Sequence, residues 1–114
     1  MKKLLALIMV LVLSTWAFAD RDSFFELVKT GSPEQVSAAI QAGADVNARD
    51  EDGLPALMWA ASFNENPEVI TVLIDAGAEM NARNNKDETA FDLAKKNEHI
   101  KGTDAYWKLN DARF

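Results

Sequence analysis

The feature that most constrains this chain is an internal repeat with a period of 34 residues. Residues 33–49 read PEQVSAAIQAGADVNAR, and residues 67–83 read PEVITVLIDAGAEMNAR. Nine of these seventeen positions are identical, and three more exchange Val for Ile, Ser for Thr or Asp for Glu. Self-similarity at a fixed period of about 20–50 residues is the signature of a fold made by stacking one unit. The repeat therefore predicts a solenoid in which each unit packs against its neighbours.

Each of the two proline positions predicts the start of a helix. Ser32 and Asn66 stand at the N-cap, and Pro33 and Pro67 follow at the first helical position. Gln35 completes a capping box after Ser32. Apolar residues then recur at helical spacing, namely Val36 and Ile40 in one unit and Ile70, Leu73 and Ile74 in the other.

Each unit also contains an earlier helix and a turn. Gly43 and Gly77 lie where the second helices should end in a left-handed residue. We read each unit as helix, tight loop, helix and hairpin-like turn, so the predicted fold is all-α. The expected first helices have their own start signals: Ser23 and Glu26 for residues 24–29, Pro55 for residues 55–61, and Thr89 and Asp92 for residues 90–96.

Four segments share motifs with one family of repeat proteins: VSAAIQAGADVNAR at 36–49, DEDGLPALMWAA at 50–61, VITVLIDAGAEMNAR at 69–83 and DETAFDLA at 87–94. In these segments the sequence resembles the ankyrin-repeat family, over residues 23 to about 97. The resemblance implies a solenoid of about three helix-turn-helix units with polar terminal caps. The units would span about residues 20–49, 50–83 and 84–114.

The chain departs from the family pattern in two places. Members usually carry Thr-Pro-Leu-His at the start of the first helix, whereas residues 55–58 read PALM and residues 89–92 read TAFD. The Thr–His hydrogen bonds between neighbouring units should then be absent, which is expected to loosen the stack. One extra residue near Asn64 and Glu65 lengthens the inter-helix loop, so the period is 34 in place of the usual 33.

Large apolar residues at equivalent places in the units are predicted to be core residues. Phe24, Leu57 and Phe91 occupy equivalent places in three units, where stacked repeats bury their first helices. Trp59 and Phe63 are four residues apart and should share a helical face. Phe63 aligns with a family position on the concave side, so it is either an exposed binding anchor or a residue packed on the lengthened loop.

The last segment is expected to close the stack as a terminal cap. Its outer side must meet water, so only one of its faces should be apolar. In residues 98–114 the predicted apolar face consists of Ile100, Tyr106, Trp107 and Leu109.

The N-terminal segment has the three parts of a secretory signal peptide. A positive start at Lys2 and Lys3 precedes ten apolar residues, 4–13, and a small-x-small cleavage motif ends at Ala19. We expect cleavage after Ala19, which leaves a domain of residues 20–114 in the periplasm or outside the cell. A retained anchor is the alternative, although a membrane span needs roughly 20 apolar residues.

Composition excludes several classes of partner. Cleavage removes two of the twelve basic residues and leaves 18 acidic ones, so the mature chain has a net charge of −8. This charge argues against binding nucleic acid or an anionic membrane surface. The absence of cysteine excludes disulfides and thiolate–zinc sites. We expect a monomer when no partner is bound.

The sequence contains little that predicts catalysis. His99 is the only histidine, there is no Cys nucleophile, and no serine is placed against His99 by sequence. Asp50, Glu51 and Asp52 lie together at a predicted turn, where acids are usually solvated, and their spacing does not match a calcium loop. We predict no catalytic residue, metal or cofactor. An enzyme or metal binder that uses His99 is the alternative.

The resemblance implies that another protein binds the concave face, through the turn tips and the exposed side of the first helices. This predicts a periplasmic or secreted protein-binding module, such as a dedicated partner or inhibitor of an exported protein. A secreted factor that acts on a host or foreign protein is the alternative. The predicted binding residues are Arg49, Glu51, Asp52 and Leu54 in one tip, Arg83, Asn85, Lys86 and Glu88 in the next, and Ser62, Phe63, Lys95 and Lys96 on the helices.

Overall fold

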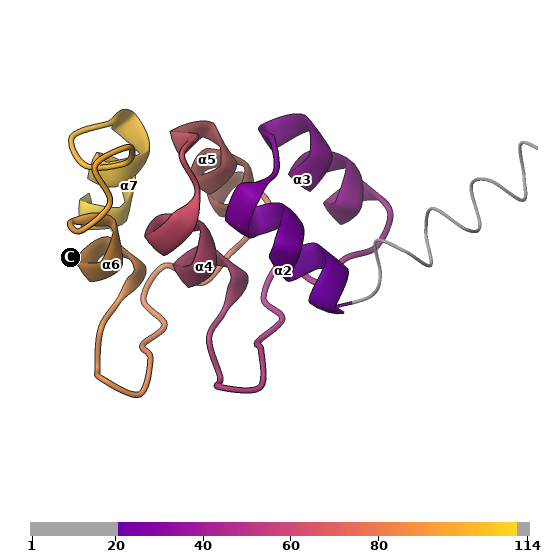
Figure 1. The fold of residues 1–114 in the computed structure, drawn as a ribbon, viewed down its shortest axis with the longest axis horizontal. Helices are drawn as coiled ribbons and strands as arrows, with labels where there is room; N and C mark the ends of the chain where they lie inside the picture. The colour runs from indigo at the N-terminus through magenta and orange to yellow at the C-terminus, as the bar shows by residue number, and fades with distance from the viewer. Residues whose placement is uncertain (1–20, 112–114) are drawn as a thin grey trace, which may run out of the picture.

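The computed structural model describes residues 21–111 and contains three stacked pairs of helices (Figure 1). Within this range no strand forms, and one isolated antiparallel bridge joins Arg49 to Pro55. The predicted all-α solenoid is confirmed, whereas the predicted signal peptide lies outside the described residues. The pairs are α2 (Arg21–Thr30) with α3 (Pro33–Gln41), α4 (Ala56–Phe63) with α5 (Pro67–Asp75), and α6 (Ala90–Ala94) with α7 (Asp104–Asp111).

The helices form two layers. Helix α4 packs between α2 and α6, and α5 packs between α3 and α7. The long turns that join one pair to the next extend from the same side of the stack (Figure 1). No helix within residues 21–111 has the length and apolar character needed to cross a membrane. Because the turns are aligned, residues from successive units can act together on one face.

The second helices begin and end as the sequence predicts. The backbone N–H of Gln35 donates to Ser32 Oγ at 3.2 Å, and the N–H of Ser32 donates to Gln35 Oε1 at 2.9 Å. At the next unit the N–H of Glu68 donates to Asn66 Oδ1 at 3.0 Å. Gly43 and Gly77 end the helices with φ values of 109° and 99°. Glycine is favoured there because a Cβ atom is strained at positive φ.

The first helices differ in detail from the prediction. Helix α2 begins at Arg21, so Ser23 lies inside the helix and its predicted role as N-cap is wrong. Helix α4 continues past the predicted end to Phe63. The capping box of Thr89 and Asp92 is confirmed, but α6 ends at Ala94 in place of residue 96. The following residues turn instead, so the terminal unit has a shorter first helix than the central one.

The core lies between the two layers. Phe24, Leu57 and Phe91, at equivalent places in the three first helices, are all buried, as predicted. Ile70 and Leu73 from α5 are fully buried between the neighbouring pairs. Burying a large apolar side chain contributes about 1.5–3 kcal/mol. The stack therefore depends on these repeated positions.

Two buried asparagines join the first helices across units. The amide of Asn64 donates from Nδ2 to the carbonyl oxygens of Val28 and Gly31 at 2.9 and 3.1 Å. Asn97 repeats this arrangement in the next unit, where its Nδ2 donates to the carbonyl oxygen of Ala61 at 3.0 Å and to that of Asn64 at 2.9 Å. These amides connect the units in place of the Thr–His pairs whose absence was expected to loosen the stack.

A second set of polar contacts joins the turns. Asn47 Nδ2 donates to the carbonyl oxygen of Gly77 at 3.2 Å, and the N–H of Glu79 donates to Asn47 Oδ1 at 2.8 Å. Arg49 Nη2 lies 3.4 Å from Glu79 Oε2. These contacts fix the spacing between successive turns.

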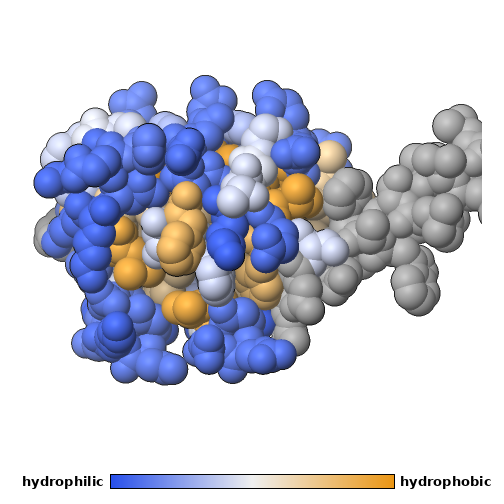
Figure 2. Space-filling model, in the orientation of Figure 1, coloured by the Kyte–Doolittle hydropathy of each residue, from blue (hydrophilic) through white to orange (hydrophobic). Residues whose placement is uncertain are grey.

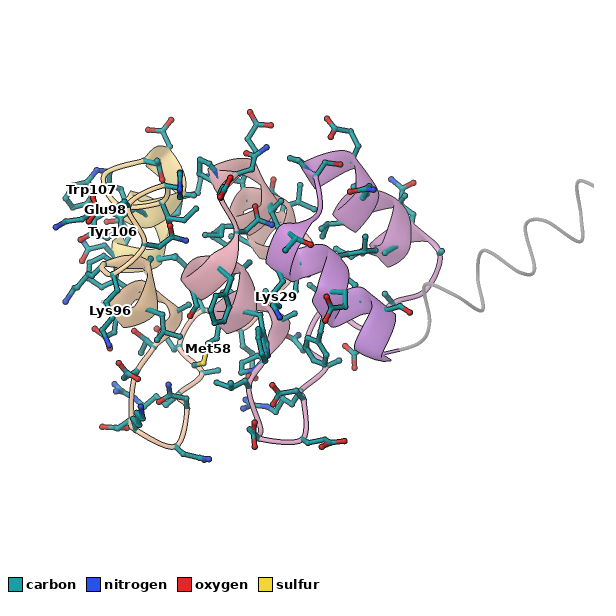
Figure 3. The ribbon with its side chains drawn as sticks, in the orientation of Figure 1. Lys29, Met58, Lys96, Glu98, Tyr106 and Trp107 are labelled. Atoms are coloured by element: carbon teal, nitrogen blue, oxygen red, sulfur yellow. The ribbon has the colours of Figure 1, made fainter. Side chains whose placement is uncertain are left out.

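The terminal unit closes one end of the stack. Ile100, Tyr106 and Leu109 are buried, but Trp107 is 52% exposed, so its predicted place on the inner face is wrong. Ile100 precedes α7, and Trp107 follows Tyr106 directly on that helix, where adjacent residues point about 100° apart. The Trp107 ring instead makes an edge contact with Tyr106, with centroids 4.9 Å apart, at the C-terminal end of the stack (Figure 3).

Candidate partner-binding surface

The first turn tip, residues 50–54, is shaped by Asp50. Its Oδ1 accepts hydrogen bonds from the N–H groups of Asp52 at 2.9 Å and Leu54 at 2.8 Å, and Gly53 has a φ of 80°. Its Oδ2 accepts from the indole Nε1 of Trp59 at 2.7 Å. Asp50 is half-buried and anchors the tip on α4, so the expected solvated role is wrong for this residue.

The second turn tip, residues 84–88, follows the same plan with different residues. Asn84 Oδ1 accepts from the N–H groups of Lys86 and Glu88, both at 2.9 Å. Asp87 has a φ of 64° at the place where the first tip has Gly53. Both tips thus have a polar side chain that holds the turn closed from within.

A groove of about 350 Å³ lies between the two tips and the exposed side of α4. Figure 2 shows an apolar area over α4 and toward α6, with the hydrophilic turns along one border. The labelled Met58 lies between the two turns (Figure 3). Apolar side chains line the groove from Leu54, Met58, Trp59, Phe63 and Leu93, and polar ones from Asp52, Ser62, Asn84, Asn85, Lys86 and Glu88.

Phe63 is the most exposed large apolar side chain within residues 23–111, at 56%. Its ring centroid lies 5.3 Å from that of Trp59, so the shared helical face predicted for these residues is confirmed. One side of the Phe63 ring packs on Trp59 of the same helix while the rest remains open, so the ring is exposed, and its role as a binding anchor stays a prediction. An exposed ring at the edge of an apolar groove can serve as a binding anchor.

Lys29 from α2 reaches over these aromatic rings. Its Nζ lies 5.0 Å from the Trp59 ring centroid and 5.7 Å from that of Phe63. Ammonium groups are attracted to the faces of aromatic rings at such distances. Sequence reasoning missed this residue because the contact crosses from one unit to the next. Lys29 lies four residues before Pro33, and nothing in the sequence around it indicates a contact with Trp59 or Phe63.

The structure brings most of the predicted binding residues together. Glu51 lies outside the groove, in an adjoining hollow that also includes Asp52 and Trp59. The predicted residues that line the groove are Asp52, Leu54, Ser62, Phe63, Asn85, Lys86 and Glu88.

The remaining four predicted residues are basic, do not line the groove, and make contacts within the protein. Each arginine donates from Nη1 to a backbone carbonyl oxygen of its own turn tip at 2.9 Å. The two lysines form ion pairs, at 3.6 Å for the first and 2.9 Å for the second. The contacts are Arg49 with Gly53, Arg83 with Asp87, Lys95 with Asp92, and Lys96 with Glu88.

Two carboxyl groups near the groove have shifted pKa values. The hydrogen bond from Lys96 lowers the pKa of Glu88, and Asn84 lowers it further. The backbone N–H of Thr89 lowers the pKa of Asp92. In turn, Glu88 raises the pKa of Lys96. Glu88 is therefore a fixed negative charge on the groove at neutral pH.

His99 lies away from the groove, on the loop before α7. Its side chain is exposed, and its Nε2 lies 3.9 Å from Glu65 Oε1. Within residues 21–111, no group of three or more His, Cys, Asp or Glu side chains is placed to hold a metal ion.

Known protein families can now be compared with this arrangement of groove, aligned turns and repeated helix pairs. The family described as "Ankyrin repeats (3 copies)" matches residues 24–104. No curated protein matches the chain. Repeats of this family are in general protein-binding modules that do not catalyse reactions. Because the match covers well over half of the chain and agrees with the three stacked helix pairs, the chain belongs to the ankyrin-repeat family.

Proposed function

We propose that this chain is an exported binding module that holds one partner protein against the groove, in the periplasm or outside the cell. The observation that carries the proposal is the exposed ring of Phe63 beside a groove whose apolar lining is bordered by polar turn tips. Contiguous apolar surface with a polar rim is typical of protein interaction sites.

The residues that form the groove are also held in place by contacts within the protein. Trp59 is held by Asp50, and the tips are closed by Asp50 and Asn84 before any partner arrives. A surface that is already ordered loses less conformational entropy on binding. This favours recognition of a partner by a preformed face over folding of the module on its partner.

Export is supported by the N-terminal sequence pattern. The pattern of Lys2 and Lys3, the apolar run and the motif ending at Ala19 is that of a cleaved signal peptide. A dedicated partner or inhibitor of an exported protein would use the groove in the periplasm. A secreted factor would use the same groove on a host or foreign protein, and the compartment in which the chain accumulates separates the two.

The test is capture of the partner by the full chain with a tag after Phe114. Cells are fractionated, proteins are crosslinked, and what co-purifies is identified by mass spectrometry. Phe63→Glu should abolish capture because it places a charge at the edge of the apolar groove. Trp107→Glu is the matched control, since Trp107 is similarly exposed but lies on α7 and does not line the groove.

Each result of this experiment has a distinct meaning. A protein that wild type and Trp107→Glu capture, and Phe63→Glu does not, supports the proposal and identifies the partner. Equal capture by all three chains would mean that the groove is not the binding site. Processed chain in the medium favours the secreted factor, and unprocessed chain in the membrane fraction favours the retained anchor. Circular dichroism of each variant shows whether the fold is intact.

A further inference from the structure

A second hollow adjoins the groove and has a different chemical character. It encloses about 400 Å³ between α2, α4 and the first turn tip. Trp59 and Asp52 line both spaces, so the two lie side by side with the Trp59 side chain between them. We call this space the acidic hollow, and its lining consists of Phe25, Glu26, Lys29, Asp50, Glu51, Asp52 and Trp59.

The acidic hollow has an excess of negative charge. Its four carboxylates and one ammonium give a net charge of −3. Asp50 is engaged by the turn and by Trp59, but the carboxylates of Glu26, Glu51 and Asp52 form no ion pair with any side chain that the structure describes. A ligand cation would therefore meet carboxylates that no described side chain neutralises.

The position of Lys29 shows what this surface accepts. Its ammonium lies over the faces of Trp59 and Phe63, at 5.0 and 5.7 Å, and forms no ion pair with a described carboxylate. An internal cation thus already occupies the aromatic face that separates the groove from the acidic hollow. Lysine has a flexible stem, so this ammonium can move into water when another cation takes its place.

We propose that the groove and the acidic hollow together bind a partner segment in which a large apolar side chain stands next to Arg or Lys. The apolar side chain enters the groove against Leu54, Met58 and Leu93. The basic side chain stacks on Trp59, displaces Lys29, and is neutralised by Glu51 and Asp52. This inference depends on the proposed function, because it specifies the chemistry of the protein segment that the groove holds.

An acidic segment fits this surface less well. The lining of the hollow and the net charge of −8 on the mature chain both repel carboxylates and phosphates. Lys29 and Lys86 are the cations that line the two spaces, and the ammonium of Lys29 lies over the aromatic rings. Charge complementarity therefore favours a basic segment, and it gives Lys29 the role of an internal competitor.

The direct test uses three synthetic peptides with Gly and Ser flanks around a central pair: Leu-Arg, Leu-Glu or Ser-Arg. Chain expressed from the full sequence is titrated with each peptide, and NMR follows the indole N–H of Trp59, assigned with Trp59→Phe. The Leu-Arg peptide should bind roughly tenfold more tightly than either of the others, which is about 1.4 kcal/mol. Equal or tighter binding of the Leu-Glu peptide, or no shift of the indole signal at millimolar Leu-Arg peptide, would overturn the proposal.

Charge variants provide the second readout. The double variant Glu51→Lys/Asp52→Lys should weaken the Leu-Arg peptide roughly tenfold, by the same free-energy conversion. The control Asp75→Lys/Glu98→Lys makes the same change in net charge at exposed residues that line neither space, and should leave binding nearly unchanged. Lys29→Met should tighten binding of this peptide, because the competing ammonium is gone. Weaker binding by Lys29→Met would show that Lys29 contacts the ligand, and would overturn its role as competitor.

The capture experiment separates failure of this inference from failure of the proposed function. If Phe63→Glu abolishes capture of a partner while Glu51→Lys/Asp52→Lys leaves capture unchanged, the groove binds a protein but the partner is not recognised by its basic residues. If Phe63→Glu has no effect on capture, the groove itself is not the site. Loss of capture in both variants, with the Asp75→Lys/Glu98→Lys control intact, supports both.

Discussion

The central unit (residues 50–83) and the terminal unit (residues 84–111) share one plan but are held together differently. Helices α4 and α5 each pack between two neighbours of their own layer, whereas α6 and α7 each have such a neighbour on one side only within the described residues. Two ion pairs lie wholly within the terminal unit, Lys95 with Asp92 and Lys96 with Glu88, whereas Glu79 and Arg83 of the central unit pair with residues outside it. The central unit is therefore packed on both sides, and the terminal unit on one side, within the part of the chain that the structure describes.

The two turn tips show the same contrast at smaller scale. The first tip has Gly53 at positive φ, and glycine adopts this conformation without strain because it has no Cβ atom. The second places Asp87 at positive φ. Arg83 donates to the carbonyl oxygen of Asp87, as Arg49 does to that of Gly53, and it also contacts the Asp87 carboxylate at 3.5 Å. Asp is among the residues that tolerate this conformation. The first tip thus forms because glycine adopts positive φ freely, and the second forms with an added contact between Arg83 and Asp87.

The largest expected effect is in the buried interior. Leu73→Ala should lower the free energy of unfolding by about 2–5 kcal/mol, because Leu73 is fully buried and the cavity cannot be filled by neighbours on both sides. Ile74→Ala, on the same helix but only partly buried, should cost less. Urea unfolding measures both. A larger loss for Ile74→Ala would mean that the second helices do not bury the face described above.

The link between the two units gives the next largest effect. Asn97→Ala removes the amide that donates to the carbonyl oxygens of Ala61 and Asn64, so two buried acceptors lose their donor. Such a loss should cost about 1–3 kcal/mol. Hydrogen exchange should rise more in α6 and α7 than in α2 and α3, because neighbouring units in a solenoid contact only each other. Uniform acceleration across all helices would contradict this division.

Substitutions at the turn tips should change stability less than the two above, and by different amounts in the two units. Gly53→Ala should destabilise the protein by about 1 kcal/mol, because it places a Cβ at a φ of 80°. The added Cβ meets no atom within 4 Å, so this cost is one of backbone conformation and not of packing. Asp87→Gly should change stability less, because the relief of backbone strain offsets the loss of the contact with Arg83. Thermal unfolding of both variants tests the comparison.

The smallest effect is the pH dependence of the terminal unit. The pKa of Glu88 is lowered in the folded state, so its pairing with Lys96 stabilises the protein above the unfolded pKa and is lost as the pH falls through the folded pKa. Lys96→Met should raise the pKa of Glu88 toward its ordinary value, and an NMR titration of the carboxyl group measures this. Lys95→Met should change the pKa of Asp92 little, because the Thr89 backbone is the main cause of that shift. A large change there would contradict the assignment.

Signals that are local in sequence predicted most of the fold. The capping residues Ser32, Asn66 and Thr89 and the glycines at positive φ lie within a few residues of the helix ends that they define. The repeat then fixed which helices stack. Trp107 was placed wrongly because the apolar residues after Glu98 were assigned to one face, although Ile100 lies in a turn before α7.

The candidate site could be predicted only in part. The family pattern identified the turn tips and the exposed side of α4, so it found Phe63 and most of the groove. It missed the contacts that depend on stacking, such as Lys29 over Trp59 and the amide of Asn64 on Val28, where the partners are 30 and 36 residues apart. The sequence around Lys29 and Asn64 does not indicate these contacts, because each depends on which ring or carbonyl group of the neighbouring unit lies within reach.

Because Trp107 is exposed and Trp59 is not, the two indoles can serve as separate fluorescent probes within one chain. The indole of Trp59 is hydrogen-bonded within the central unit, whereas that of Trp107 meets solvent on the last helix. A chain processed after Ala19 would keep these two of its three tryptophans. Emission from the variants Trp59→Phe and Trp107→Phe would follow each indole separately during unfolding. If the terminal unit detaches before the rest, as its one-sided packing favours, the two emission curves will have different midpoints.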